Sequence, residues 1–515
     1  MGAFPHAAAL AIVWYGARAM QLSLPPIPHN RRRFRAALTI GLLLALGAAL
    51  VPLGGCDGVP IATPEKPKPL DGVALALSCP DAAFADAVAP MVRSWEVRTG
   101  AKVTLARADM TPADATDLAV IPAGKLGEWA EPGHLAPLPA RLRAADHPVR
   151  WFEFLPAYTD RLVAWGDRPH AVPLTGDGVV LVYRADRFAD CRLSPPATWE
   201  EFARVAEALV ARNKQPSLPP LPADAGRVFD LFSRIAASFD RPALSDKDVE
   251  RRGRDADVLT FQFALPAGTP RLKAPGFADA AALLAGLHAS GCFPPAGGPD
   301  DPVAALADGR AMLAVLSLDQ VARLPREGGA VPARFGVTNV PGAKRYFDPA
   351  KGGYADSPSI NYVPHFAGGR LGVVRTRCPH PDAAFDLLAE IGGPARGAEL
   401  IATPGLGAGP TRAAHLDRDR LLPWLAYGFD EKRSNALQDA LRYYADQTVK
   451  NPTFGLRGPD RAALTAAAGD ALRKLGTGAK PADALTEALT AWEALDAKTP
   501  PATLKSWRQH AAGLN

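Results

Sequence analysis

The amino-terminal segment constrains this chain most, because it has the pattern of a signal that is removed before the remainder folds. Residues 31–35 hold four arginines, and an apolar run from Ala36 to Val51 follows directly. A basic stretch followed by a short apolar stretch is typical of secretory signal peptides. The run has about 16 residues, fewer than the ~20 that span a bilayer. A cleaved signal over residues 1–56 is therefore favoured over a permanent membrane helix.

The end of this segment resembles the bacterial lipobox, in which small residues precede a cysteine that becomes lipid-modified. Here the residues are Leu53-Gly54-Gly55-Cys56. We expect Cys56 to carry the lipid anchor; the alternative is an ordinary cleaved signal with a chance cysteine. Both place the protein outside the cytoplasm, at the periplasmic face of the envelope. Met20 is an alternative start, and the choice between inner and outer membrane stays open.

The charge balance of the mature part gives no support for a basic nucleic-acid-binding surface. The chain has a net charge of +5, but residues 1–56 contain five arginines and no acidic residue. The rest holds 53 basic and 53 acidic residues. The excess positive charge belongs to the targeting segment, so it gives no support for a nucleic-acid partner.

Four cysteines remain after Cys56, and their spacing matches no zinc motif. In an oxidising compartment they allow one or two disulfides, with three full pairings that the sequence does not separate. We expect neither a metal nor a cofactor. The four are Cys79, Cys191, Cys292 and Cys378.

Strand-like and helix-like segments alternate once a Pro-rich tether over residues 57–70 has ended. Residues 73–77 predict a strand, and the apolar spacing from Ala82 to Thr99 predicts a helix. Residues 103–105 and 118–121 predict two more strands, with helical stretches between them. This alternation is typical of parallel α/β units.

Several short motifs occur in the order in which bacterial extracellular solute-binding proteins of the sugar type carry them. Pro195-Pro196-Ala197-Thr198-Trp199-Glu200-Glu201-Phe202 is similar to the family's P-P-x-T-W-e-e-f, with Thr198 as a helix N-cap. Other matches are Asp117 to Gly124 with the following Gly-x-Leu-x-Pro-Leu, His170 to Leu174, Val179 to Phe188, Ala307 to Val315, Phe335 to Gly342, Gly368 to Val374, Pro381 to Leu388, Gly409 to Arg412 and Pro481 to Leu485.

This resemblance implies a two-lobed α/β fold of the type II periplasmic-binding-protein class, with discontinuous lobes and a hinge. It implies a first lobe of residues 71–178 and 336–400 and a second lobe of 179–335 and 401–512. Residues 213–271 fit the pattern least and are predicted to be a divergent part of the second lobe. Their role stays open.

The resemblance also implies a binding site between the lobes, where loops after strands supply polar groups. Asp177 falls where the chain crosses between lobes, so it is either a ligand-binding acid or part of a turn. Ser78 is either a cleft donor or a helix N-cap. The complete set of candidate ligand-binding residues is Asp177, Arg370, Ser78, Gly124, Lys125, Tyr354, Tyr362 and Trp424.

Two positions depart from the sugar-binding pattern of the family. Arg370 stands near paired glycines where an aromatic residue is common, and a guanidinium there suits a carboxylate or phosphate unless it faces solvent. Leu318 stands where sugar binders often carry a Trp, which weakens carbohydrate as the ligand. Tyr354, Tyr362 and Trp424 are among the aromatic residues that could replace it as stacking platforms.

No catalytic motif is present: the sequence lacks G-x-S-x-G, H-E-x-x-H and G-x-x-x-x-G-K. We therefore expect a non-enzymatic, monomeric binding lipoprotein that delivers a small solute, a sugar or related polyol, to the permease of an ABC importer. The alternative is an envelope lipoprotein, a sensor or a structural component, that keeps the fold without transport.

Overall fold

The computed structural model describes residues 68–108, 114, 116–252, 258–295 and 300–515. Residues 67–515 form one compact unit. The predicted signal peptide, Cys56 and nearly all of the tether lie outside the described residues. No described helix is long and apolar enough to cross a membrane.

The first lobe is built on a five-stranded sheet with the order β2-β1-β3-β15-β6. Its strands are β1 (Ala74–Ser78), β2 (Lys102–Ala106), β3 (Leu118–Pro122), β6 (Ala171–Thr175) and β15 (Arg370–Val374). β1 pairs in parallel with β2 and β3, whereas β15 runs antiparallel to β3 and β6. The predicted strands at residues 73–77, 103–105 and 118–121 are confirmed to within a residue.

Helix α1 (Ala82–Thr99) forms where the apolar spacing predicts it. Asp81 caps its first turn by accepting from the backbone N–H of Phe84, and Gly100 ends it at φ +86°. Glycine adopts the left-handed backbone conformation at little energetic cost, which explains why the helix ends here. Helix α10 (Pro381–Ile391) packs on α1, β15 and β6, and α11 (Pro394–Ile401) also packs on β6.

The second lobe contains a three-stranded antiparallel sheet with the order β10-β7-β11, formed by Leu313–Ser317, Val179–Arg184 and Phe335–Thr338. Side chains alternate across β7, as the geometry of a strand requires. The described residues form two hydrophobic cores: the first core surrounds the five-stranded sheet, and the second core lies within the second lobe. Val180 and Val182 pack into the first core, whereas Val179 and Leu181 pack into the second core. The central strand of this sheet is therefore buried on both faces.

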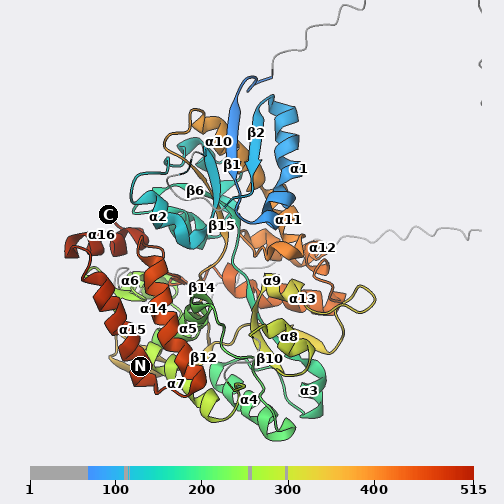
Figure 1. The fold of residues 1–515 in the computed structure, drawn as a ribbon, viewed down its shortest axis with the longest axis vertical. Coiled ribbons are helices and arrows are strands. Elements are labelled where there is room, and N and C mark those ends of the chain that lie inside the picture. Colours follow the sequence, from blue (N-terminus) through green and yellow to red (C-terminus); the bar gives the residue numbers. More distant parts are fainter. Residues whose placement is uncertain (1–67, 109–113, 115, 253–257, 296–299) are drawn as a thin grey trace, which may run out of the picture. The chain divides into compact units, whose positions relative to one another are not determined.

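Helices cover both faces of this small sheet (Figure 1). The second core is formed mainly by helices that pack on one another: α4 (Trp199–Asn213), α5 (Ala225–Asp240), α7 (Pro275–Ala289), α14 (Arg461–Arg473) and α15 (Pro481–Asp496). Against the sheet also lie α3 (Ala185–Asp190), α8 (Pro302–Ala307), α9 (Leu318–Ala322) and α13 (Glu431–Ala440).

The remaining elements are short or peripheral. They are α2 (Leu126–Ala130), α6 (Asp246–Arg252), α12 (Leu422–Leu425), α16 (Pro501–Ala511), β4 (Ala164–Trp165), β5 (Arg168–Pro169), β8 (Phe263–Ala264), β9 (Thr269–Pro270), β12 (Ala343–Asp348), β13 (Gly353–Asn361), β14 (His365–Phe366) and β16 (Thr453–Phe454).

The segment from residue 336 returns to the first lobe later than predicted. β11 pairs with β7 in the second sheet, and Val340, Ala343 and Val363 lie in the second core. Only at β15 does the chain rejoin the five-stranded sheet. The motif gave the strand correctly but placed it in the wrong sheet, because the sequence of a strand does not name its hydrogen-bonding neighbour. The other lobe bounds stay predictions.

The least family-like stretch, residues 213–271, supplies α5, which packs against α7 and α14 in the second core. The sequence of α5 is amphipathic, and its apolar face is buried in this core. The four cysteines are free thiols, and Cys79, Cys292 and Cys378 are buried. The disulfides that the cysteine count allowed are therefore absent from this structure.

Candidate functional site

The crossing from β6 to β7 is built from Gly176, Asp177 and Gly178. Gly176 pairs with Gly409 through two backbone hydrogen bonds of 2.9 and 3.0 Å. A Cβ on Gly409 would lie 1.9 Å from the carbonyl oxygen of Asp177, and one on Gly176 would lie 2.2 Å from that of Pro410. Two backbone segments thus pass in contact where the lobes join, and only glycine fits there.

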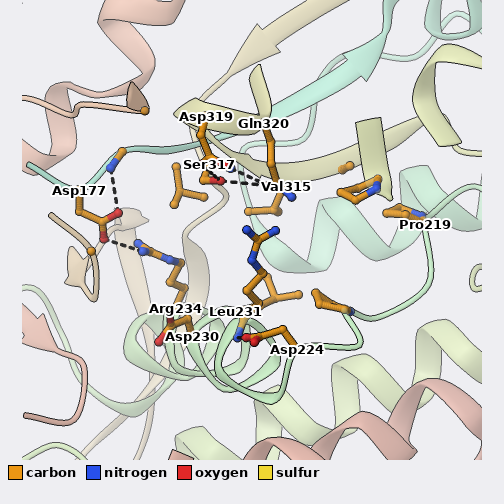
Figure 2. A pocket seen from close by; sticks show the side chains of 18 of the residues that line it. Asp177, Pro219, Asp224, Asp230, Leu231, Arg234, Val315, Ser317, Asp319 and Gln320 are labelled. Carbon is orange, nitrogen blue, oxygen red and sulfur yellow. Dashed lines mark hydrogen bonds and ion pairs between the residues drawn. The ribbon is translucent and has the colours of Figure 1, made fainter. Parts of the chain in front are cut away.

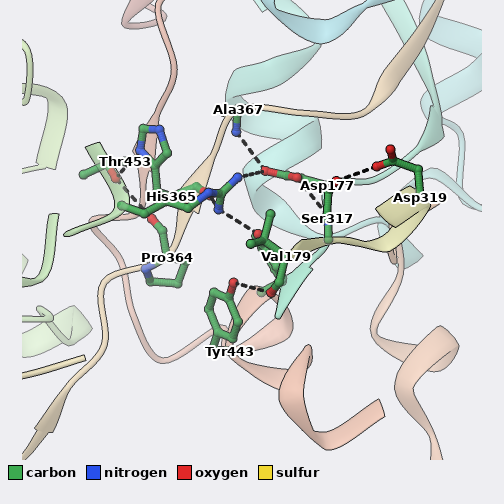
Figure 3. Close-up of polar contacts among 12 residues, drawn as sticks. Asp177, Val179, Ser317, Asp319, Pro364, His365, Ala367, Tyr443 and Thr453 are labelled. Carbon is green, nitrogen blue, oxygen red and sulfur yellow. Dashed lines mark hydrogen bonds and ion pairs between the residues drawn. The ribbon is translucent and has the colours of Figure 1, made fainter. Parts of the chain in front are cut away.

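Asp177 is buried in this crossing and is held by an ion pair (Figure 3). Its Oδ2 accepts from Arg234 Nη2 at 2.6 Å and from the backbone N–H of Ala367 at 3.0 Å. Burial alone would raise the pKa of Asp177. Arg234 and the backbone N–H groups of Ala367 and Gly368 outweigh burial and hold that pKa below its usual value.

Arg234 extends from α5 to three acceptors at the crossing. Besides Asp177, its guanidinium donates to the carbonyl oxygen of His365 at 2.7 Å and to Tyr444 Oη at 2.8 Å. Three acceptors in a planar fork satisfy a buried arginine well. The set joins the β6 to β7 crossing, the segment before β15 and the second lobe.

Arg370, at the start of β15, makes a second polar bridge. Its guanidinium pairs with Asp81 and donates to the carbonyl oxygen of Leu406 at 3.0 Å. It also lies 5.3 Å from the centre of the Phe84 ring. The guanidinium is therefore already paired within the protein, and its side chain is 23% exposed.

A cavity of about 860 Å³ lies between these crossing segments and the second lobe. Figure 2 shows Val315, Ser317, Asp319 and Gln320 along one wall, with Leu231 and Asp230 of α5 on the opposite wall. First-lobe elements contribute Asp81, Pro122 and Arg370. Both lobes therefore line one cavity, the arrangement that closes around a ligand.

Oxygen-bearing side chains are frequent in the wall of this cavity. Carboxylate and amide oxygens accept hydrogen bonds from hydroxyl groups. Their positions around one cavity suit a ligand that carries several hydroxyls. The residues are Asp81, Asp224, Asp230, Asp300, Ser317, Asp319 and Gln320.

Asp230 is half-buried in the cavity wall, and among the described residues its carboxylate has no hydrogen-bonding partner. Burial raises its pKa to about 6, and the negative charge of Asp177 adds to the rise, while Arg234 opposes it. An unpaired carboxyl group that faces a cavity is available to a ligand.

Ser317 and Asp319 belong to the turn that begins α9. Ser317 Oγ donates to Asp319 Oδ1 at 2.5 Å, and the backbone N–H of Ser317 donates to Gln320 Oε1 at 3.0 Å. These bonds fix the turn while leaving Asp319 half-buried at the cavity. The turn is thus preformed rather than dependent on a ligand.

The structure brings two of the eight predicted site residues, Asp177 and Arg370, to the cavity. Both lie in its wall with their charges already paired. Asp177 forms part of a turn, one of the two alternatives predicted for it, and it also lines the cavity. It accepts from the backbone N–H of Gly178 at 2.8 Å.

The other six predicted site residues do not line this cavity. Trp424 is fully buried, and its Nε1 donates to the carbonyl oxygen of His415. Ser78 donates to the carbonyl oxygen of Ala108 and is not the cap of α1, which is Asp81. Both side chains make contacts inside the protein, which sequence reasoning missed because neither burial nor loop geometry can be inferred from residue type.

The remaining four of these six residues lie away from the cavity because their elements pack elsewhere. Tyr354 is 44% exposed on β13 and stacks under Arg345, and Tyr362 donates to the carbonyl oxygen of Ala197. A Cβ on Gly124 would lie 3.2 Å from Arg461 Cδ, so this residue faces α14, and Lys125 follows it in the same turn.

Sequence reasoning missed the acidic residues of the cavity. Asp230 lies in the stretch that fits the family pattern least, and Asp319 follows Leu318, a position that departs from the sugar-binding pattern. One signal was available for Asp319: Ser317 to Gln320 has the S-x-x-Q spacing of a capping box after a buried strand. No local signal marks Asp230. Among the described residues, no group of His, Cys, Asp or Glu could hold a metal ion.

Comparison with known proteins identifies a family. The model of the bacterial extracellular solute-binding protein family matches residues 99–396, more than half of the chain. No curated protein sequence matches this chain.

Solved structures with the same fold come from several bacteria. The sugar-binding protein MalE of Xanthomonas citri is 18% identical, with a TM-score of 0.60 over 83% of this chain and 98% of that one. A solute-binding protein of Agrobacterium radiobacter in complex with ribitol is 18% identical, with a TM-score of 0.58 over 83% and 100%. The cyclic α-maltosyl-1,6-maltose binding protein of Arthrobacter globiformis gives the same four values. These similarities establish the two-lobed fold.

Proposed function

Because this chain belongs to the bacterial extracellular solute-binding protein family, we propose that it captures a sugar or polyol in the cavity between its lobes. The observation that carries the proposal is the wall of that cavity, in which oxygen-bearing side chains from both lobes face one space of about 860 Å³. Similar structures contain ribitol, D-mannitol and maltose. Solutes with several hydroxyl groups suit these acceptors.

Asp230, Asp319 and Gln320 are the residues to which we assign the hydroxyl groups of the solute. Asp230 has no partner of its own among the described residues, and Asp319 is held at the cavity by Ser317. Asp177 and Arg370 shape the cavity through their pairs with Arg234 and Asp81. They influence binding indirectly, because they fix the shape of the crossing segment that lines the cavity.

The rest of the proposed function follows from the family and from the amino-terminal segment. The protein is exported, anchored through a lipid on Cys56, and acts as a monomer that hands its solute to the permease of an ABC importer. The protein binds its solute without transforming it. Mass spectrometry of the mature amino terminus tests the anchor: a diacylated peptide that begins at Cys56 is expected.

A thermal-shift and calorimetric screen of residues 67–515 tests the binding. The panel contains maltose, other mono- and disaccharides, ribitol and D-mannitol. A ligand at a hundred times its Kd adds about 2.7 kcal/mol to the free energy of unfolding. Asp319→Ala and Asp230→Ala are expected to weaken binding at least tenfold, while Asp308→Ala, an exposed residue outside the cavity, leaves it unchanged.

If none of the sugars and polyols in the panel stabilises the protein, the proposal is refuted. This result would favour an envelope lipoprotein that keeps the fold without transport. Binding that persists unchanged in both cavity variants would leave the function standing but assign it to a different surface.

A further inference from the structure

The cavity continues from the polar crossing into an apolar recess within the second lobe. At the crossing it meets charged and hydroxyl side chains. Beyond the crossing, hydrophobic residues of the second core form most of the wall, together with Asp224, Arg227 and Asp300. We define the apolar recess as the part of the cavity lined by Trp199, Phe202, Leu218, Pro219, Leu221, Leu231, Leu283, Leu284, Leu287, Phe293 and Val315.

Hydrogen bonds hold the proline-containing loop, residues 218–222, over this recess. The backbone N–H of Leu218 donates to the carbonyl oxygen of Cys292 at 2.9 Å, and that of Met312 donates to the carbonyl oxygen of Ser217 at 2.7 Å. The loop is thereby fixed between the segment after α7 and the start of β10. Figure 2 shows Pro219 at the opposite side of the cavity from Asp177.

Three apolar side chains of the recess keep surface that no core residue covers. Leu231, Leu283 and Val315 are half-buried, and each packs on the second core while also lining the cavity. Leu231 and Val315 come from opposite walls (Figure 2). Covering such surface with an apolar group is favourable by about 25 cal/mol per Å².

The size of the cavity allows a ligand that reaches both parts. Its volume of about 860 Å³ lies near the top of the roughly 300–1,000 Å³ range that drug-sized ligands occupy. A small polyol held by Asp230 and Asp319 would leave the apolar recess filled only with water. Water gains little beside the apolar side chains of the recess, which offer it no hydrogen bonds.

We propose that the natural ligand is amphiphilic, with a hydroxylated head at the crossing and an alkyl or aryl tail in the apolar recess. The proposal rests on the proposed function, because the head is the sugar or polyol assigned there. It narrows the substrate class to glycosides or polyol derivatives that carry an apolar substituent. Free sugars then bind more weakly than their alkyl derivatives.

Calorimetry on the full-length protein in lipid nanodiscs tests this with methyl, butyl and hexyl glycosides of glucose and maltose. Empty nanodiscs provide the blank for partition into lipid. Each buried methylene contributes up to about fourfold in affinity. We expect Kd to fall at least tenfold from the methyl to the hexyl glycoside.

Two variants fill the recess from opposite walls, so that one misfolded protein does not decide the result. Leu231→Trp and Val315→Phe are expected to abolish the dependence of Kd on the length of the alkyl chain. Leu422→Trp is the matched control, because Leu422 is 80% exposed on α12 and lies outside the cavity. It should behave as the wild type, and melting curves confirm that each variant is folded.

The outcomes separate this inference from the proposed function. Binding of methyl glycosides with no gain for the hexyl compounds overturns the amphiphilic ligand and leaves sugar binding intact. A third outcome is that 1-hexanol binds, that both filling variants lose this binding, and that no glycoside binds. That outcome overturns the hydroxylated head and retains the apolar recess as a binding site. Binding of neither class overturns both.

Discussion

Asp177 Oδ2 accepts a hydrogen bond from Arg234 Nη2 at 2.6 Å, and both side chains are at least nine-tenths buried. Asp177 lies in the first crossing between the lobes, whereas Arg234 comes from α5, in the stretch with the weakest family likeness. The pair therefore links the crossing to the core of the second lobe. It fixes the crossing segment about which the two lobes would rotate in a hinged closure.

Replacing Arg234 is expected to destabilise the protein strongly. Arg234→Met leaves the buried carboxylate of Asp177 without its cation, a change that costs about 3–5 kcal/mol. Urea unfolding followed by circular dichroism measures it. The control is Arg323→Met, which breaks the exposed pair with Asp301 and should cost no more than about 1 kcal/mol. Equal losses in both variants would contradict a structural role for the buried pair.

Gly409→Ala is expected to lower the free energy of unfolding, because its Cβ would lie 1.9 Å from the carbonyl oxygen of Asp177. Overpacking of this kind costs at least 1–3 kcal/mol. Gly286→Ala is the contrasting variant, since Gly286 lies in α7 with nothing within 4 Å of its added Cβ. Alanine should stabilise that helix by about 0.5–1 kcal/mol. Differential scanning calorimetry compares the two; a neutral Gly409→Ala would refute the tight crossing.

Asp230 should make the free energy of unfolding fall as the pH rises from about 4 to about 6. Burial raises its pKa in the folded protein from the ordinary 3.8 to about 6. Between these values the folded state binds more protons than the unfolded state, so raising the pH disfavours folding. Asp230→Asn removes this contribution. Urea unfolding of both proteins across this window should show their difference growing with pH, whereas Asp308→Asn, at an exposed site, should track the wild type.

Trp424→Ala is expected to reduce stability by about 3–5 kcal/mol, the cost of a large cavity in a core. Trp424 is fully buried and its Nε1 donates to the carbonyl oxygen of His415 at 3.0 Å. Ligand affinity per folded molecule should stay unchanged, because the residue does not line the cavity. Leu422→Ala, at an 80% exposed position, should alter stability by less than about 0.5 kcal/mol. Loss of affinity in a folded Trp424→Ala protein would restore its predicted role as a binding residue.

Local features of the sequence determined several elements of the fold. The helix over Ala82–Thr99 follows from apolar spacing, and Thr198 caps α4 by accepting from the backbone N–H of Glu201 at 3.2 Å. Helix periodicity, caps and strand alternation act within a few residues, so a single sequence displays them. The order of family motifs then indicated two lobes and a crossing at Asp177.

The binding cavity depended on the tertiary structure, because its residues are brought together from distant segments. Asp81, Asp230, Asp319 and Arg370 are separated by tens to hundreds of positions and meet only after both lobes have folded. Burial also reassigned Trp424 and Ser78, since residue type alone does not say whether a side chain faces a core or a cavity. The sequence by itself determined the elements and their order through local interactions. The packing of the two cores decided which carboxyl groups face the cavity, among them Asp230 without a hydrogen-bonding partner among the described residues.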